Sequence, residues 1–372
     1  MMRLKGLGLL LLIASSGCAV FRGARGSEKA IELEAVQITG DLELDKLNDE
    51  ELFAAATSFF AAEDFTQAAR YFGRICDFHP GSRHRRAALY NAGLALEKVK
   101  RWEEAYGRFF ELSDPAKGTG DALDAAFRVA ETLYHMNRFD EAVALLTVVS
   151  NRGDLSMNKR IEARVQQGIC ELEAGQSDTA EMTLRKVVQT WQDLADKDQI
   201  EDYFPAQAQF FLGEIFRLHY EAVELDADKS VDQLSKDLEY KSELLLSSQG
   251  HYLRSIRIGN GYWATASGAQ IGSLYENLYN HMVNSKAPHE LNAEEADVYK
   301  LELRKKIRVL ITKAITIYER TLEAAERIGA SSPFVERTRE SLKRMKDLLI
   351  AEANAEEGTP PAAAERSPVP HT

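Results

Sequence analysis

The chain has 372 residues, and its 46 Lys and Arg against 58 Asp and Glu give a formal net charge of −12. This acidic balance argues against a dedicated nucleic-acid-binding protein, which needs a basic field along the phosphates. Hydrophobic residues make up 45% of the chain, which is enough to bury a core, and three cysteines are too few for a disulfide framework.

The first residues have the layout of an export signal. A short positive segment precedes an apolar run over 7–14, which is too short to span the ~30 Å of a bilayer core. The run ends in SSGC at 15–18. This sequence resembles the lipobox of bacterial lipoproteins, in which the cysteine is lipidated and becomes the first residue. The resemblance implies a signal peptide over 1–17 and lipidation of Cys18; the alternative is an ordinary signal peptide with an unrelated cysteine.

The residue after Cys18 is Ala19 and not the Asp that retains such lipoproteins in the inner membrane. The resemblance therefore implies anchoring to the outer membrane, on its periplasmic face, through lipid alone. Residues 18–48 are predicted to be the lipidated cysteine and a tether. Within the tether, 31–44 alternates in part between apolar and polar residues, which fits either a short strand added to a partner's sheet or an extended linker.

A repeat follows over residues 49–222. Four segments place a small residue twelve positions before an alanine and a large apolar residue four positions further on. The small residues are Ala56, Gly93, Ala130 and Gly168, the alanines are Ala68, Ala105, Ala142 and Ala180, and the large residues are Phe72, Phe109, Leu146 and Leu184. Two antiparallel helices cross closely only where one side chain is small, and large neighbours then fill the groove. This pattern resembles the tetratricopeptide repeat, with unit spacings of 37, 37 and 38 residues.

The C-terminal half departs from this pattern but stays helical. A fifth unit begins at Gly213, and beyond it apolar residues recur at three- and four-residue steps. We interpret 223–350 as divergent repeats that end in a capping helix over 333–350, because the last apolar face of an array has no neighbour. The Pro- and Ala-rich stretch 351–372 is predicted to be a disordered tail.

Together these features predict an all-α fold, a tetratricopeptide-like helical-repeat superhelix with a divergent helical C-terminal half. The chain as a whole resembles tetratricopeptide-repeat outer-membrane lipoproteins of Gram-negative bacteria, including BamD-like and pilotin-like lipoproteins. Its long C-terminal half is closer to the repeat lipoproteins of the gliding-motility envelope complex. The resemblance implies a periplasmic scaffold that binds other cell-envelope proteins and is not an enzyme.

The sequence also lacks common motifs of catalysis and cofactor binding. The sequence has no HExxH, no Cys/His pair at metal spacing, no GxSxG, no P-loop and no GxGxxG. We therefore predict no cofactor, no metal site and no small-molecule substrate. Two alternatives stay open: a peptidoglycan-associated structural protein, and a periplasmic enzyme with a site around Tyr252, Trp263 and His281.

The candidate binding residues share one register. Three residues before the small residue of each unit lie Phe53, Tyr90, Phe127, Val165 and Phe210, four of them aromatic. In tetratricopeptide repeats the first helix lines the concave face, so the resemblance implies an aromatic stripe there that binds a partner segment. Arg128, Tyr134 and Arg217 fall at neighbouring registers and are predicted to supply polar contacts. The alternative is that this register packs against the preceding helix.

Overall fold

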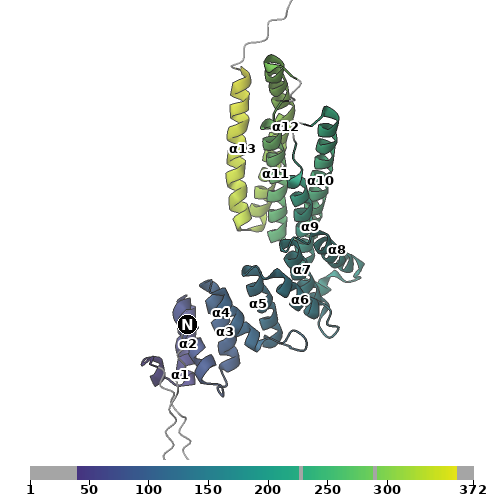
Figure 1. The fold of residues 1–372 in the computed structure, drawn as a ribbon. Coiled ribbons are helices and arrows are strands. Elements are labelled where there is room, and N and C mark those ends of the chain that lie inside the picture. The colour runs from purple at the N-terminus through teal and green to yellow at the C-terminus, as the bar shows by residue number, and fades with distance from the viewer. Residues whose placement is uncertain (1–39, 226–228, 288–290, 358–372) are drawn as a thin grey trace, which may run out of the picture. The chain divides into compact units, whose positions relative to one another are not determined.

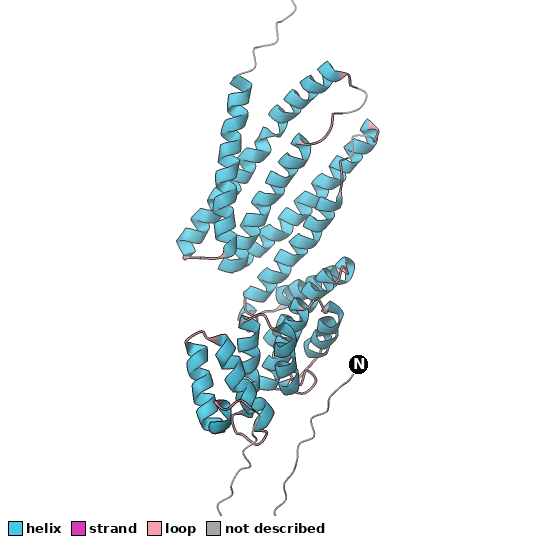
Figure 2. Ribbon diagram, turned by 60° about the vertical axis from the view of Figure 1, so that its left-hand side comes forward, coloured by secondary structure: helices cyan, strands magenta, loops and turns pink. Residues whose placement is uncertain are grey.

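The computed structural model describes residues 40–225, 229–287 and 291–357. These residues contain thirteen α-helices, two short 3-10 turns and no strand, which confirms the all-α prediction (Figures 1 and 2). Residues 47–372 form one compact unit and residues 1–46 another, in which the described part contains a 3-10 turn over Leu44–Lys46. The predicted signal peptide, Cys18 and most of 31–44 lie outside the described residues.

The helices alternate between two roles, which we call A and B. An A helix carries the small residue of a unit, and the B helix that follows carries the large one. The A helices are α1 (Asp49–Ala61), α3 (Arg85–Lys98), α5 (Asp121–His135), α7 (Met157–Glu173), α9 (Tyr203–Ala222) and α11 (Gly261–Val283). The B helices are α2 (Phe65–Phe78), α4 (Trp102–Leu112), α6 (Phe139–Ser150), α8 (Ser177–Asp193), α10 (Val231–Ile258) and α12 (Ala293–Ile328).

The close crossings predicted for the four repeats are present. A Cβ atom built on Gly93 lies 2.5 Å from the ring of Phe109, and one built on Gly168 lies 2.8 Å from Leu184. In all four units the large residue is fully buried, with 0–1% of its surface exposed. The glycine or alanine therefore sets the distance between A and B helix, and the large residue fills the space next to it.

The turns between A and B helices are alike as well. The residue seven positions after the small one has a left-handed backbone in each unit, with φ between 58° and 78°. These residues are Glu63, Lys100, Asn137 and Gly175. Only the fourth is a glycine, although an L-residue in this conformation is strained by roughly 1–2 kcal/mol. The same turn geometry is thus kept in four units despite its cost in three.

The C-terminal half continues the alternation with longer helices. A Cβ atom on Gly213 of α9 would lie 2.5 Å from the ring of Tyr252 on α10, and Gly272 of α11 faces Tyr318 on α12 in the same way. The small residue and the large residue are 39 and 46 positions apart in these two pairs, whereas they are 16 positions apart in each of the first four units. The pairs α9–α10 and α11–α12 are therefore elongated versions of the same unit.

The array ends in α13 (Pro333–Glu357), which packs against α11 and α12 and occupies the place predicted for a capping helix (Figure 1). The helix continues seven residues beyond position 350, so the predicted disordered tail does not begin at 351. The segment 351–357 reads AEANAEE, which is rich in good helix formers and lacks Gly and Pro. The first helix breakers are in GTPP, at 358–361, beyond the described residues.

Candidate functional site

The aromatic register predicted to line a binding face is largely packed inside. Phe127 and Phe210 keep only 8% and 5% of their surface exposed, and Phe53 and Tyr90 are half-buried. A continuous exposed stripe of four rings is therefore not what the structure contains. Whether the exposed parts of Phe53 and Tyr90 contact a partner stays a prediction.

Their packing follows from the position one turn before the close crossing. The ring of Phe53 meets that of Phe72 at 5.5 Å between centroids, Tyr90 meets Phe109 at 5.6 Å, and Phe210 meets Tyr252 at 5.5 Å. In each pair the second ring is the large residue of the same unit's B helix. The register thus extends the A–B contact by one more ring. These three rings pack on the B helix that follows them, whereas the alternative given above was the preceding helix.

The predicted polar residues instead link successive A helices. Arg128 on α5 contacts Glu131 one turn further on at 2.7 Å and reaches Glu97 on α3 at 3.5 Å. Tyr134, also on α5, donates its phenolic hydrogen to Glu173 on α7 at 3.3 Å. Three A helices are therefore joined by side chains that cross from one unit to the next.

Glu97 is the most buried carboxylate of this group. Its side chain is 11% exposed, and its Oε1 atom has no hydrogen-bond partner among the described residues. Burial raises the pKa of Glu97 to about 7, because the effect of desolvation exceeds the opposite effect of Arg128. This carboxyl group is therefore partly protonated near neutral pH.

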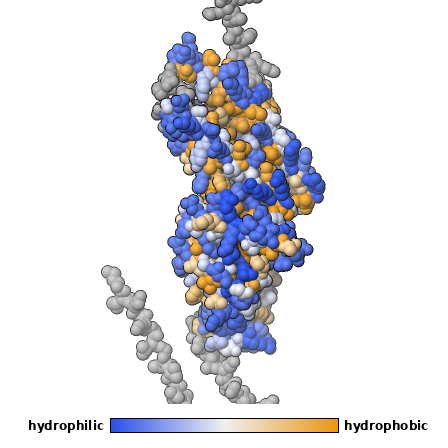
Figure 3. All heavy atoms as spheres, turned by 90° about the vertical axis from the view of Figure 1, so that its right-hand side faces the viewer, coloured by the Kyte–Doolittle hydropathy of each residue, from blue (hydrophilic) through white to orange (hydrophobic). Residues whose placement is uncertain are grey.

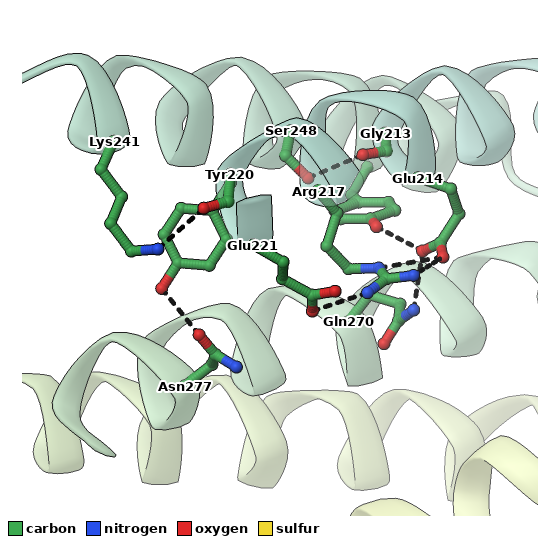
Figure 4. A network of polar contacts seen from close by, with 10 residues as sticks. Gly213, Glu214, Arg217, Tyr220, Glu221, Lys241, Ser248, Gln270 and Asn277 are labelled. Atoms are coloured by element: carbon green, nitrogen blue, oxygen red, sulfur yellow. Dashed lines mark hydrogen bonds and ion pairs between the residues drawn. The ribbon is translucent and has the colours of Figure 1, made fainter. Parts of the chain in front are cut away.

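Arg217 belongs to a larger network across three helices, which Figure 4 shows. Its guanidinium donates to Glu214 at 2.8 and 3.0 Å and to Glu221 at 2.6 Å, all on α9. Glu214 also accepts hydrogen bonds from Gln270 on α11, at 2.6 Å, and from the hydroxyl of Tyr252 on α10. One carboxylate thus receives donors from three helices.

Beside this network lies a buried cation that the sequence analysis did not identify. Lys241 on α10 is fully buried and donates to the carbonyl oxygen of Tyr220 at 2.7 Å (Figure 4). It also donates to the carbonyl oxygen of Val223 at 2.8 Å, where α9 ends. Its ammonium also lies 4.1 Å from the centroid of the Tyr220 ring. Burial lowers the pKa of Lys241. Lys241 thus caps the C-terminal end of α9. The sign of this cap in the sequence is a lysine at a position of α10 where the periodicity expects an apolar residue.

We call these polar side chains of the A helices the A-helix ladder. Its members are Glu97, Arg128, Glu131, Tyr134, Glu173, Glu214, Arg217, Glu221, Gln270 and Glu276. Glu276 on α11 accepts a hydrogen bond from Tyr318 at 2.8 Å and one from Arg344 on α13 at 3.1 Å. The ladder holds six carboxylates and two guanidinium groups. Glu97, Glu214 and Glu276 are largely buried, so the exposed acidic groups of the ladder are Glu131, Glu173 and Glu221.

The residues suggested for an enzymatic site do not come together. Tyr252 and Trp263 are buried on either side of Phe210, with ring centroids 5.5 and 5.0 Å from it. His281 stacks on Tyr220 instead, and it lies eighteen residues after Trp263 on α11, about 27 Å along the helix. Among the described residues no group of three or more His, Cys, Asp or Glu is placed to hold a metal ion. None of the described helices combines the length and the apolar character needed to cross a membrane.

No protein-family model matches the chain, and no curated protein matches it. Solved structures that are similar to it include the apo form of RapI, with 9% identity, a TM-score of 0.42, and coverage of 83% of this chain and 100% of that one. A tetratricopeptide repeat protein from Parabacteroides merdae has 14% identity, a TM-score of 0.35 and coverage of 80% and 98%. A TPR repeats protein from Bacteroides fragilis has 11% identity, a TM-score of 0.28 and coverage of 82% and 98%. Similarities at this level carry no argument about a partner or an activity.

Proposed function

We propose that this protein is a membrane-anchored periplasmic scaffold lipoprotein that binds other cell-envelope proteins along the A-helix ladder. The sequence SSGC at 15–18 supports lipidation at Cys18, and Ala19 supports the outer membrane. The observation that carries the binding role is the set of polar side chains on the A helices, which link α3 to α5 and α5 to α7, and α9 to α11. The buried aromatic rings stabilise each unit by packing between its A and B helices. The polar side chains of the ladder are the groups that we propose to contact a partner.

The negative charge of the ladder favours a partner segment with positive charge. Glu131 is 49% exposed, Glu221 is 39% exposed, and Glu173 is exposed as well. These three exposed carboxylates outnumber the two guanidinium groups of the ladder, Arg128 and Arg217. A partner segment that places Lys or Arg side chains along the A helices therefore meets a complementary field, which directs encounter and fixes register.

The test is capture of partners from solubilised membranes by the lipidated protein. The double variant Glu131→Lys, Glu173→Lys reverses charge at two exposed ladder positions on α5 and α7. We expect it to weaken capture about tenfold or more. The matched control is Glu323→Lys on the B helix α12, which is also exposed and lies outside the ladder. Equal capture by wild type and double variant would refute binding through the ladder.

Identification of the captured protein tests the finer form of the proposal. The long helices that follow residue 223 favour, by resemblance, a component of a gliding-motility envelope machine. Recovery of an outer-membrane assembly or secretion component instead would favour the BamD-like or pilotin-like role.

A further inference from the structure

A pocket of about 410 Å³ lies between α8, α9 and α10, formed by two consecutive B helices and the A helix between them. Figure 3 views the side of the molecule on which Figure 1 labels α8 and α10, and hydrophilic residues there border hydrophobic patches. The pocket shares no residue with the A-helix ladder. Its volume falls within the range of roughly 300–1,000 Å³ that is typical of small-ligand sites.

Two buried polar side chains form part of the pocket lining. Gln209 on α9 is 3% exposed and His251 on α10 is 6% exposed. The Nδ1 atom of His251 lies 2.9 Å from Oε1 of Gln209, and its ring stacks on Phe216 with the planes 10° apart. An amide oxygen only accepts, so Nδ1 carries the hydrogen and Nε2 is left as an acceptor. Burial lowers the pKa of His251 to about 4, with further lowering by Arg254 and Arg185, which keeps the imidazole neutral.

Two arginines, together with Gln189, Gln192 and Ser247, complete the polar part of the pocket. Arg185 on α8 and Arg254 on α10 are both exposed lining residues. No Asp or Glu lines the pocket, although acidic residues outnumber basic ones in the chain. Arg185 forms an ion pair with Glu181 at 2.6 Å, whereas Arg254 has none with any described residue. A Cβ atom on Gly250 would lie 3.9 Å from both terminal nitrogens of Arg254, so the guanidinium lies across that glycine.

The remaining wall is apolar, formed by Val188, Leu212, Phe216 and Leu246. The pocket thus combines guanidinium donors, a neutral imidazole acceptor, glutamine amides that can donate or accept, and an apolar surface. An inorganic phosphate could pair with the guanidinium groups and donate its hydroxyl hydrogen to Nε2, but it has no apolar part to pack on the apolar wall. A carboxylate that carries a neighbouring amide group and an apolar side chain matches the guanidinium donors, the acceptor Nε2 and the apolar wall.

We propose that this pocket binds an N-acyl amino carboxylate, the chemistry of a peptide's C-terminal residue or of a free N-acyl amino acid. The carboxylate pairs with Arg254 and Arg185, the amide N–H donates to Nε2 of His251, and the side chain packs on the apolar wall. Charge-assisted hydrogen bonds to guanidinium are among the stronger polar contacts, so Arg254 carries most of the recognition.

The test is calorimetric titration of the full-length protein in detergent with matched probes. These are acetyl-Ala-Leu-Ala with a free carboxylate, the same peptide as its C-terminal amide, N-acetyl-leucine and inorganic phosphate. We expect saturable binding of the free peptide, at least tenfold weaker binding of the amide, and no binding of phosphate. Tighter binding of the tripeptide than of N-acetyl-leucine identifies a peptide end as the ligand, and equal binding identifies a small N-acyl amino acid.

Variants then assign the binding to this pocket. Arg254→Gln is expected to weaken binding of the free peptide tenfold or more, and Arg185→Gln to weaken it further. Arg257→Gln is the matched control, because Arg257 is exposed on the same helix three residues on and does not line the pocket. The proposal is overturned if wild type binds none of the carboxylate probes, if it binds acid and amide equally, or if the Arg254→Gln, Arg185→Gln variant binds as wild type does.

Discussion

The ring of Tyr252 occupies the space in which any side chain at position 213 would begin. A Cβ atom on Gly213 would lie 2.5 Å from that ring, closer than real Cβ contacts allow. Gly213 and Tyr252 are 39 positions apart in the sequence and bring α9 and α10 together. Gly272 and Tyr318 make the same contact between α11 and α12 at a separation of 46 positions. The same contact therefore organises units of very different loop and helix length.

Gly213→Ala is expected to lower the free energy of unfolding by about 1–3 kcal/mol, because the methyl group forces Tyr252 or a helix to shift. Gly107→Ala on α4 is the control, since Gly107 is exposed and a Cβ atom there meets nothing within 4 Å. That control should gain roughly 0.5–1 kcal/mol through helix propensity. Urea denaturation followed by circular dichroism measures both.

Gly93→Leu and Ala142→Leu place large side chains at the close crossings of the second and third units. Gly93 faces the ring of Phe109, and Ala142 is fully buried. Each variant should lose about 1–3 kcal/mol or more. Unchanged melting temperatures would show that these helices do not cross where the repeat places them.

Phe127→Ala is expected to act on stability first. The ring is 92% buried in the core, since only 8% of its surface is exposed, and removing such a ring costs about 3–5 kcal/mol. Tyr90→Ala should cost less, because Tyr90 is half-buried. Chemical denaturation and partner capture by the folded protein separate the two effects. Weaker capture with unchanged stability in Phe127→Ala would instead place that ring at an interface.

The stability of the protein is expected to depend on pH through Glu97. Its pKa is raised from 4.5 to about 7, so the folded state holds a proton that the unfolded state has released. Between these values stability falls as pH rises, by at most about 3 kcal/mol from this group. Glu97→Gln should flatten the decrease between pH 4.5 and 7 in unfolding free energies measured at each pH. Parallel curves for both proteins would mean that Glu97 titrates normally.

The left-handed turns can be tested by exchanging glycine and non-glycine residues at two equivalent positions. Lys100 has φ 59° and Gly175 has φ 78° at the equivalent position. Lys100→Gly is expected to stabilise the protein by about 0.5–1 kcal/mol, because the relief of strain exceeds the added chain entropy. Gly175→Ala should destabilise it by about 1 kcal/mol for the opposite reason. Effects of equal sign in a thermal melt would contradict a shared turn conformation.

Membrane attachment is expected to depend on Cys18. Cys18→Ala removes the proposed lipidation site, and the variant should move from the membrane pellet to the soluble fraction after cell fractionation. Carbonate extraction distinguishes an anchor from a tightly bound partner. A variant that stays in the pellet after carbonate would show that another element holds it there.

The first four units were predictable because their small and large residues recur at one spacing of 16. In α9–α12 the glycines were visible, but a sequence spacing of 39 or 46 gives no sign that Tyr252 and Tyr318 are their partners. The aromatic register was visible too, yet periodicity alone does not tell a ring that packs on its B helix from one that faces solvent. Arg128, Tyr134 and Arg217 were found by register, whereas the links that join them to Glu97, to Glu173 and, through Glu214, to Gln270 depend on how neighbouring units lie side by side.

The repeated turn has a consequence for how such a chain changes length. Glu63, Lys100, Asn137 and Gly175 are equivalent joints, spaced 37, 37 and 38 residues apart. A recombination event between any two of them adds or removes one or more whole units and leaves both flanking helices with a turn of the same geometry. The reach of the array can therefore evolve in steps of one unit, and the A–B crossing at the joint then pairs the small residue of one unit with the large residue of another.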